Sequence, residues 1–222
     1  AGVIVGMRVE GLGIPANTTV TGVTGTTVTL SNTPTTAGST SLTFTSGNVG
    51  VTKTGNGLLV LNGTNHYLGK TIVNQGTLRI SSEVNLGDNP TSMDASHLLI
   101  NAGVIQFNSS MTFDDANRGI TIGDAGGRFE VGTANGHIFT VNLNTPIVAS
   151  GVLEVAVRGD QSVPSSSILN LGTNFSSNTY AGGLKTEQFT GLTNVNGSNT
   201  IGHIFVEAGE ISLNGSNMLT GN

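Results

Sequence analysis

The sequence predicts an all-β protein whose main part is a solenoid, and three observations support this. Short runs of β-branched and aliphatic residues recur along the 222-residue chain, and no segment has the apolar spacing of a helix. Glycine (33 residues) and asparagine separate these runs, whereas proline occurs only 5 times. Short motifs also recur far apart in the chain, as expected when one structural unit is stacked repeatedly.

The clearest strand-and-turn pattern lies in residues 54–80, TGNGLLVLNGTNHYLGKTIVNQGTLRI. Its β-prone runs are residues 58–61, 71–73 and 77–80, and Asn-Gly or Gln-Gly turns separate them. Valine, isoleucine and threonine favour a pleated surface, whereas glycine and asparagine tolerate the positive φ of tight corners. We therefore expect short strands joined by sharp turns.

Residues 1–46 form a separate block, for which the sequence predicts a small β-sandwich-like or barrel-like module. Polar and apolar residues alternate at 27–30 and 42–44, which favours half-buried antiparallel strands. Residues 5–20 resemble a module of large bacterial and phage surface proteins. With the junction at residues 46–50, we expect a small β module over residues 1–46 and a solenoid over residues 47–222.

Further strand-sized runs continue to the end of the chain, and their charges indicate which side chains face inward. In Arg128-Phe129-Glu130-Val131 the charged residues alternate with the apolar ones. We therefore expect Phe129 and Val131 to point inward and Arg128 and Glu130 to face water. The residues expected to stack inside the solenoid are Leu59, Leu61, Ile72, Leu78, Ile80, Ile105, Phe107, Ile120, Ile122, Phe129, Val131, Val141, Leu153, Val155, Ile211 and Leu213.

Two internal echoes, which are short motifs that recur later in the chain, indicate the length of one coil. The motif GHIF at residues 136–139 recurs 66 residues later, and NGTN at residues 62–65 recurs as NGSN 152 residues later. Both offsets fit whole numbers of coils of about 22 residues, within the repeat lengths of solenoid proteins. This spacing predicts that His137 and His203 occupy equivalent positions, about three coils apart.

These motifs resemble the autotransporter-associated β-strand repeat of bacterial surface proteins. Residues 55–78 follow the pattern G-x-G-x-L-x-L-x-G-x-N-x-Y-x-G-x-T-x-V-x-x-G-T-L. In addition, NRGITIG (117–123) and GGRFEV (126–131) look like the NRGITLG and GGTFDV segment of that family. The family builds right-handed parallel β-helices outside the cell. The resemblance therefore implies this architecture for the solenoid and an extracellular or cell-surface location.

Charge and composition exclude several classes of function. Charged residues make up 9% of the chain, the net charge is −5 and only 8 residues are basic, which gives no electrostatic footprint for nucleic acid. No apolar run approaches the roughly 20 residues that span a bilayer. The chain has no cysteine, which excludes disulfides and thiolate metal sites. We expect no cofactor, no nucleic-acid partner and no membrane insertion of this segment.

One group of residues is a candidate for catalysis. It consists of Asp114, Asp115, Asp124 and Glu130, with Arg118 and Arg128 nearby. Two carboxylates at a suitable separation can act as acid and base on a glycosidic bond. The alternative, which we favour, is that these side chains bind turn amides or decorate a solvated strand. The chain lacks tryptophan, and its two tyrosines, Tyr67 and Tyr180, offer few rings for stacking on sugars. We predict no catalytic, cofactor-binding or metal site.

Two other patterns carry little functional weight. The four histidines, His66, His97, His137 and His203, show neither H-x-H nor H-E-x-x-H spacing, and we expect them at surface or corner positions. The triplet Arg158-Gly159-Asp160 matches the tripeptide that integrins bind. Glycine-rich chains contain such triplets easily by chance, so the sequence does not decide whether a receptor binds this one.

The sequence favours a non-catalytic structural segment or subunit of an extracellular bacterial surface fibre or passenger. One alternative is an adhesin that binds glycans or host surfaces through a face of the solenoid, and another is a polysaccharide-degrading β-helix enzyme. A catalytic β-helix should have a carboxylate-lined groove with exposed aromatic rings. An adhesin should have loops that depart from the repeat.

The two ends of the sequence predict exposed stacking surfaces. The last residues, 213–222, match the first half of the repeat that begins at residue 61, and residues 1–5 are apolar and strand-like. A solenoid cut within a repeat exposes apolar surface and unpaired strand groups. We expect neighbouring repeats of a longer chain, or head-to-tail self-association into filaments, to cover it. The residues expected in such contacts are Val3, Ile4, Val5, Ile211, Leu213, Met218 and Leu219.

Overall fold

The structure, a computed structural model, describes residues 3–16, 18–36, 41–45, 49–132, 137–158, 167–172, 177–186 and 191–221. Contacts between Cα atoms divide the chain into two compact units. The first unit contains residues 1–49 and 67–69, and the second contains residues 50–66 and 70–222.

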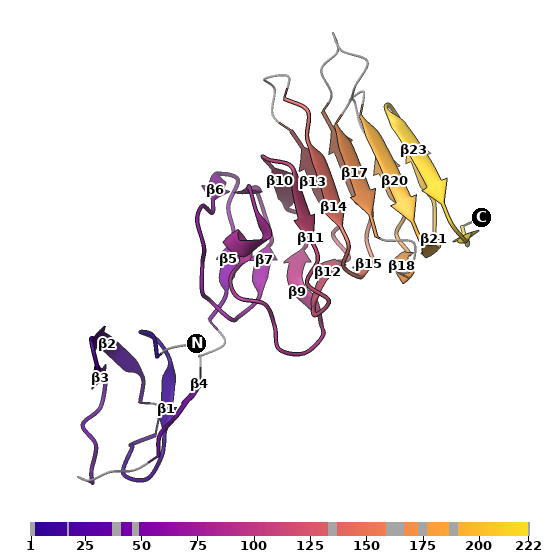
Figure 1. The fold of residues 1–222 in the computed structure, drawn as a ribbon. Helices are drawn as coiled ribbons and strands as arrows, with labels where there is room; N and C mark the ends of the chain where they lie inside the picture. The colour runs from indigo at the N-terminus through magenta and orange to yellow at the C-terminus, as the bar shows by residue number, and fades with distance from the viewer. Residues whose placement is uncertain are drawn as a thin grey trace. The chain divides into compact units, whose positions relative to one another are not determined.

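The first unit contains two antiparallel strand pairs, β1 with β4 and β2 with β3 (Figure 1). The strands are β1 (Arg8–Glu10), β2 (Val20–Thr24), β3 (Thr27–Leu30) and β4 (Thr43–Thr45). The antiparallel pairing agrees with the alternation of polar and apolar residues in the sequence. Val9 and Val20 are the buried apolar side chains of the described part of this unit. Its sandwich-like character and its boundary at residue 46 stay predictions.

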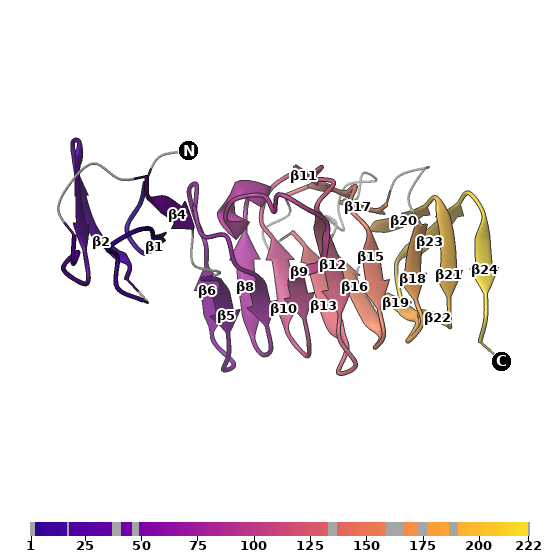
Figure 2. The same ribbon diagram turned by 90° about the horizontal axis from the view of Figure 1, so that it is seen from below.

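The second unit is a parallel β-helix whose strands form three sheets along its length (Figures 1 and 2). The chain passes from the eight-stranded sheet to the seven-stranded sheet and, from the third coil onward, to the five-stranded sheet before it starts the next coil. All strand pairs in these three sheets are parallel, which confirms the solenoid predicted from the sequence.

The strand bounds are as follows. The eight-stranded sheet contains β5 (Val51–Lys53), β7 (Thr71–Val73), β9 (Asp94–Ile100), β12 (Arg118–Ile122), β15 (Ile147–Ala149), β18 (Ser177–Tyr180), β21 (Ser198–Ile201) and β24 (Asn217–Leu219). The seven-stranded sheet contains β6 (Leu58–Val60), β8 (Thr77–Ile80), β10 (Val104–Phe107), β13 (Gly127–Val131), β16 (Leu153–Val157), β19 (Leu184–Thr186) and β22 (Ile204–Val206). The five-stranded sheet contains β11 (Met111–Phe113), β14 (Thr140–Leu143), β17 (Ile168–Leu171), β20 (Leu192–Asn196) and β23 (Glu210–Asn214).

The coils differ in length although their strands stay in register. Asn199 lies opposite Asn217, 18 residues later, whereas Glu154 lies opposite Lys185, 31 residues later. The length of about 22 residues inferred from the echoes is therefore not a fixed repeat. The strands stay in register because they must pair, and the segments between them absorb most of the variation in coil length.

Inward side chains of the three sheets form one continuous apolar core. Phe107 packs edge-on against Phe113 and Phe129, with ring centroids 6.1 and 5.6 Å apart. The predicted core residues that are buried are Leu78, Ile80, Ile105, Phe107, Ile120, Ile122, Phe129, Val131, Val141, Leu153 and Val155. Leu59, Leu61 and Ile211 are partly buried and pack against this core.

Two predicted core positions are wrong. Ile72 points outward, because its neighbours Thr71 and Val73 are the fully buried positions of β7. The run Thr-Ile-Val is β-branched throughout, so its composition does not reveal which face is inward. Leu213 is 40% exposed although it lies in register with the buried Val195. Among the described strands, β23 pairs with β20 alone, so nothing packs on its other side.

A row of asparagine amides, of which Asn178 and Asn199 are buried, interrupts the apolar stack at the start of the later strands of the eight-stranded sheet. The Asn178 Nδ2 atom donates to Asn199 Oδ1 (3.0 Å), and the Asn199 Nδ2 atom donates to Asn217 Oδ1 (2.8 Å). The Ile147 N–H donates to Asn178 Oδ1 (2.9 Å). Buried amides without partners would destabilise the fold, and the regular spacing of strands lets each amide satisfy the next.

A second amide row lies on the outer face of the five-stranded sheet. The Asn170 Nδ2 atom donates to Asn142 Oδ1 (2.7 Å), and the Asn194 Nδ2 atom donates to Asn170 Oδ1 (2.8 Å). The Asn142 Nδ2 atom continues the row to Thr112 Oγ1 (3.2 Å). Side-chain hydrogen bonds therefore join successive coils in addition to the backbone ladders.

The corner within residues 51–80 depends on a buried cation and a glycine. Lys53 is 7% exposed, and its Nζ atom donates to the carbonyls of Thr54 (2.8 Å), Gln75 (3.0 Å) and Gly55. Gly76 has a φ of 69°, and a Cβ atom there would collide with the Gly55 carbonyl oxygen. Glycine is therefore the residue that fits this corner.

A short 3-10 helix, η1 (Glu83–Leu86), lies against β11, the first strand of the five-stranded sheet. Its Leu86 side chain is fully buried in the core. The helix therefore covers an edge that would otherwise expose unpaired backbone groups. Within the described part of the chain, no helix is long and apolar enough to cross a membrane.

Candidate functional site

The outer face of the seven-stranded sheet carries a row of charged side chains. Arg128, Glu154 and Lys185 lie in register on β13, β16 and β19. The Lys185 Nζ atom is 3.9 Å from Glu154 Oε1 and 3.1 Å from Glu207 Oε1. Because successive outward positions of parallel strands align along the solenoid axis, these residues form one row.

A second polar row runs beside the first, two residues further along the strands. The Arg79 Nε atom donates to Gln106 Oε1 (2.5 Å), and the Gln106 Nε2 atom donates to Glu130 Oε2 (3.2 Å). The Arg158 Nε atom donates to Glu130 Oε1 (2.7 Å). Glu130 points away from the core, as predicted, but it is only 8% exposed. The expectation that Glu130 simply faces water is wrong, because the neighbouring polar side chains cover it.

The two rows are polar without being strongly cationic. They contain Arg79, Arg128, Arg158 and Lys185, half of the 8 basic residues of the chain. The carboxylates of Glu130, Glu154 and Glu207 lie among them. Such a face presents many hydrogen-bond donors and acceptors with little net charge, which suits polar ligands better than polyanions.

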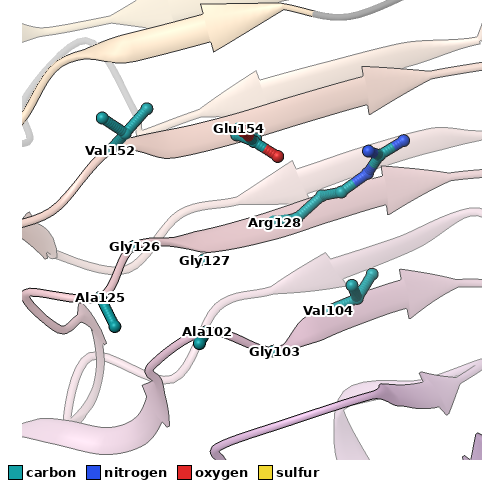
Figure 3. Close-up of a pocket in the computed structure, with 9 residues that line it drawn as sticks. All are labelled: Ala102, Gly103, Val104, Ala125, Gly126, Gly127, Arg128, Val152 and Glu154. Atoms are coloured by element: carbon teal, nitrogen blue, oxygen red, sulfur yellow. The ribbon is translucent and has the colours of Figure 1, made fainter. Parts of the chain in front are cut away.

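A surface hollow of about 420 Å³ adjoins the first row, at the corners that lead into β10, β13 and β16 (Figure 3). Arg128 and Glu154 supply its charged groups, and both side chains lie on the same side of the sheet (Figure 3). The remaining lining consists of small or apolar residues: Ala102, Gly103, Val104, Ala125, Gly126, Gly127 and Val152. Its volume lies at the lower end of the range for small-molecule pockets.

One lining residue has an uncommon backbone conformation. Ala102 has a φ of 71° and is the only non-glycine residue with positive φ in the described part of the chain. Gly126 occupies the matching corner of the next coil with a φ of 76°, and its carbonyl accepts a hydrogen bond from the Ala102 N–H (2.7 Å). The Ala102 side chain is exposed. The left-handed backbone conformation of Ala102 costs about 1 kcal/mol. Packing of its methyl group in the core does not offset this cost, because the methyl group is exposed.

The predicted acidic cluster does not converge on one point. Asp114 and Asp115 lie between β11 and β12, Asp124 lies at the next corner between β12 and β13, and Glu130 lies on the outer sheet face. Asp115 Oδ1 accepts a hydrogen bond from the Asn117 N–H (2.7 Å), as the turn interpretation predicted. The four carboxylates therefore lie on three separate segments of the coils.

Arg118 was predicted to lie beside this acidic cluster, but it is a fully buried structural residue. Its guanidinium donates to the carbonyls of Leu86 (2.8 Å) and Gly87 (3.0 Å) and to Asn89 Oδ1 (3.0 Å). The Arg118 Nε atom is 3.1 Å from Glu83 Oε1. Arg118 therefore holds η1 and the loop after it against the solenoid, and nothing in the local sequence indicates this role.

Burial has the largest effect on the pKa of Glu83, the carboxyl group beside Arg118. Burial raises the pKa of Glu83, and the Asp114 and Asp115 carboxylates act in the same direction. A hydrogen bond from the Asp114 N–H and the Arg118 guanidinium oppose the rise in pKa. Because the net pKa is raised, this carboxyl group favours the folded state more in its protonated form.

Two histidines have polar partners. The His66 Nδ1 atom is 2.8 Å from Asp88 Oδ1, at the surface as predicted. His97 was expected at the surface or a corner, but it lies on β9 and is 2% exposed. Burial and the Arg118 guanidinium lower the pKa of His97, against the opposing effect of Asp94.

The two copies of the GHIF motif are not structurally equivalent, contrary to the prediction. His137 and Phe139 precede β14 in the five-stranded sheet, whereas His203 precedes β22 in the seven-stranded sheet. Phe139 packs against the core, but in the second copy Ile204 does so and Phe205 is 47% exposed. The 66-residue echo therefore does not match the real succession of coils.

The remaining candidates have structural positions or lie outside the described residues. Tyr180 is fully buried, which raises the pKa of its hydroxyl and removes it from any sugar-binding surface. Arg158 pairs with Glu130, whereas Gly159 and Asp160 lie outside the described residues, so the use of this triplet stays untested. The described residues contain no group of three or more His, Asp or Glu side chains that could hold a metal ion.

Comparison with known proteins identifies the repeat. Residues 51–80 match the model of the passenger-associated-transport-repeat. The chain is also 30% identical over 138 residues to the autotransporter adhesin BmaC of Brucella suis biovar 1 (strain 1330), a match that covers 60% of this chain and 4% of the adhesin. No solved structure matches the chain. The chain thus carries the repeat of autotransporter passengers, and its place is outside the cell or at the bacterial cell surface.

Proposed function

We propose that this chain is a non-catalytic, stiff segment of a bacterial surface passenger. The main observation in support of this proposal is the continuous stack of three parallel sheets over one apolar core. Backbone ladders join every pair of coils, and amide rows on both the inner and the outer faces add side-chain hydrogen bonds along the same axis. A stack joined in this way resists local opening, because opening one coil breaks contacts with two neighbours.

The contacts of the candidate acidic residues support a non-catalytic role. Asp115 binds a turn amide, and Glu130 binds Arg158 and Gln106. Replacing Asp114, Asp115 and Asp124 together should therefore change no activity. Depolymerisation of a bacterial or plant polysaccharide by the wild-type chain, abolished in the triple variant, would contradict this part of the proposal.

Resistance to proteolysis tests the structural role. In β15, Ile147 is fully buried and its neighbour Val148 is 41% exposed, so the two positions form a matched pair. We expect Ile147→Asp to open the stack and make the chain sensitive to proteinase K, because a buried charge is strongly destabilising. Val148→Asp should keep the resistance of the wild type. Rapid degradation of the folded wild type through its strands would contradict the proposal.

We further propose that the chain self-associates through the free edges of its last strands. The strands β22, β23 and β24 each pair on one side only among the described strands, so their other edges can accept a further coil. The residues proposed for such contacts are Val3, Ile4, Val5, Ile211, Leu213, Met218 and Leu219; Met218 and Leu219 are 58% and 60% exposed. Light scattering after size exclusion should show concentration-dependent growth that Leu219→Asp abolishes and Val148→Asp does not. A chain that stays monomeric at high concentration would contradict self-association.

Adhesion is the second candidate function. The similarity to an autotransporter adhesin and the polar outer face of the seven-stranded sheet, with its adjoining hollow, favour it. Adhesion and a structural role are compatible, because one face can bind a ligand while the core and ladders keep the segment stiff.

A further inference from the structure

We infer that the hollow beside Arg128 and Glu154 is a binding subsite for a neutral, hydroxyl-rich glycan. This inference deepens the second candidate function and rests on it. The hollow lies on the outer face of the seven-stranded sheet, where the side chains of three successive coils meet (Figure 3).

The charges of the lining select the class of ligand. Arg128 and Glu154 lie opposite each other in register, so the hollow offers N–H donors and carboxylate acceptors side by side. A charged ligand would be attracted by one of these two side chains and repelled by the other. A neutral vicinal diol can accept a hydrogen bond from the guanidinium and donate one to the carboxylate, and neither charge repels it. The balanced lining therefore favours neutral sugars over sialylated or uronic ones.

The apolar part of the lining fits the carbon-bound hydrogens of a sugar ring. Val104, Val152, Ala102 and Ala125 present methyl groups around the hollow. Ala102 is the informative residue, because its positive φ strains the backbone and its exposed methyl group packs against no core residue. Strained residues that gain nothing within the fold are often functional. An apolar contact with a ligand would account for alanine at a corner where glycine fits the backbone better.

A single hollow should bind weakly. The volume of about 420 Å³ holds only a short stretch of a glycan, and the lining contains no aromatic ring to stack on it. Detectable binding therefore requires several copies of the chain on one particle, which raises avidity without new contacts.

The test is a glycan array probed with the biotinylated chain on tetrameric streptavidin. The neutral probes are lactose, N-acetyllactosamine, cellotriose and chitotriose, and the acidic probes are 3′-sialyllactose and a hyaluronan tetrasaccharide. Ala125→Leu fills the hollow, whereas Ala95→Leu makes the same change at an exposed alanine on β9. Glu154→Gln keeps the shape of the lining but removes the carboxylate.

We expect the wild type and Ala95→Leu to bind at least one neutral probe. Ala125→Leu should lose that binding, and Glu154→Gln should weaken it by about tenfold, the effect of one charged hydrogen bond. No binding to any neutral probe, binding to acidic probes alone, or equal binding by Ala125→Leu would each overturn the inference. Circular dichroism and proteinase K resistance of each variant test the structural role separately from glycan binding. A failure of the structural proposal would therefore be distinguished from a failure of the binding inference.

Discussion

Replacing Arg118 by methionine should destabilise the solenoid strongly. Methionine keeps most of the length of the side chain but removes the charge and all of its donors. Arg118 is fully buried, and the Glu83 side chain beside it is only 11% exposed. The substitution therefore leaves a carboxylate without its cation in a nearly dry environment.

The size of the effect follows from these contacts. Hydrogen bonds to charged groups contribute roughly 1.5–3 kcal/mol each, but the loop carbonyls that Arg118 binds can recover part of this from water. Removing one partner of a buried ion pair costs about 3–5 kcal/mol. We expect Arg118→Met to lower the free energy of unfolding by about 3–5 kcal/mol.

Urea denaturation followed by circular dichroism measures this loss, with the slope checked to be unchanged. The double variant Arg118→Met with Glu83→Met should lose less than the sum of the two single changes, because the two side chains interact directly. Limited proteolysis should show earlier cleavage within residues 81–92 in Arg118→Met. A loss below about 1 kcal/mol, the level of an exposed pair, would refute the structural role assigned to Arg118.

Three further predictions concern other buried groups. Phe129→Ala should lower the free energy of unfolding by about 3–5 kcal/mol, whereas Glu130→Ala, which removes a covered ion pair, should cost about 1–3 kcal/mol; equal losses in urea denaturation would contradict the assigned faces. The Tyr180 hydroxyl has no hydrogen-bond partner among the described residues, so Tyr180→Phe should raise stability by about 1 kcal/mol, and a clear loss of stability would show an overlooked partner. His97 has a pKa below its usual 6.5, so the unfolded state binds more protons and stability should fall as pH decreases from neutral through the lowered pKa. Thermal melts of His97→Gln should show less of this acid dependence, and an unchanged profile would assign it to other groups.

The sequence predicted the architecture well because local patterns determine it. Alternation in Arg128-Phe129-Glu130-Val131 reveals the inward face, and the structure buries Phe129 and Val131 as expected. The same argument fails at Ile72, because three β-branched residues in a row carry no alternation. It also fails for the burial of Glu130, whose cover comes from residues in the coils before and after it.

The residues of the proposed binding site were harder to predict because they meet through the register of the coils. Arg128 and Glu154 lie opposite each other only if the intervening corner has its actual length. Coil lengths vary, so a constant repeat of about 22 residues misplaces such pairs. The prediction that the two GHIF copies are equivalent was wrong for the same reason. Arg118 illustrates a second limit, since its partners come from a loop about one coil earlier that the repeat pattern does not mark.

The stacking of coils into one stiff segment is the central claim, and distances between paired spin labels test it most directly. The chain has no cysteine, so two introduced cysteines label without a background. Thr52, Thr179 and Met218 occupy outward positions of one row on the eight-stranded sheet, and Thr52 is separated from the other two by five and seven strand steps. Strands in a sheet lie about 4.8 Å apart, so pulsed electron resonance should give narrow distributions near 24 Å for Thr52→Cys with Thr179→Cys and near 34 Å for Thr52→Cys with Met218→Cys. Broad distributions, or distances that do not increase with the number of strand steps, would contradict the account.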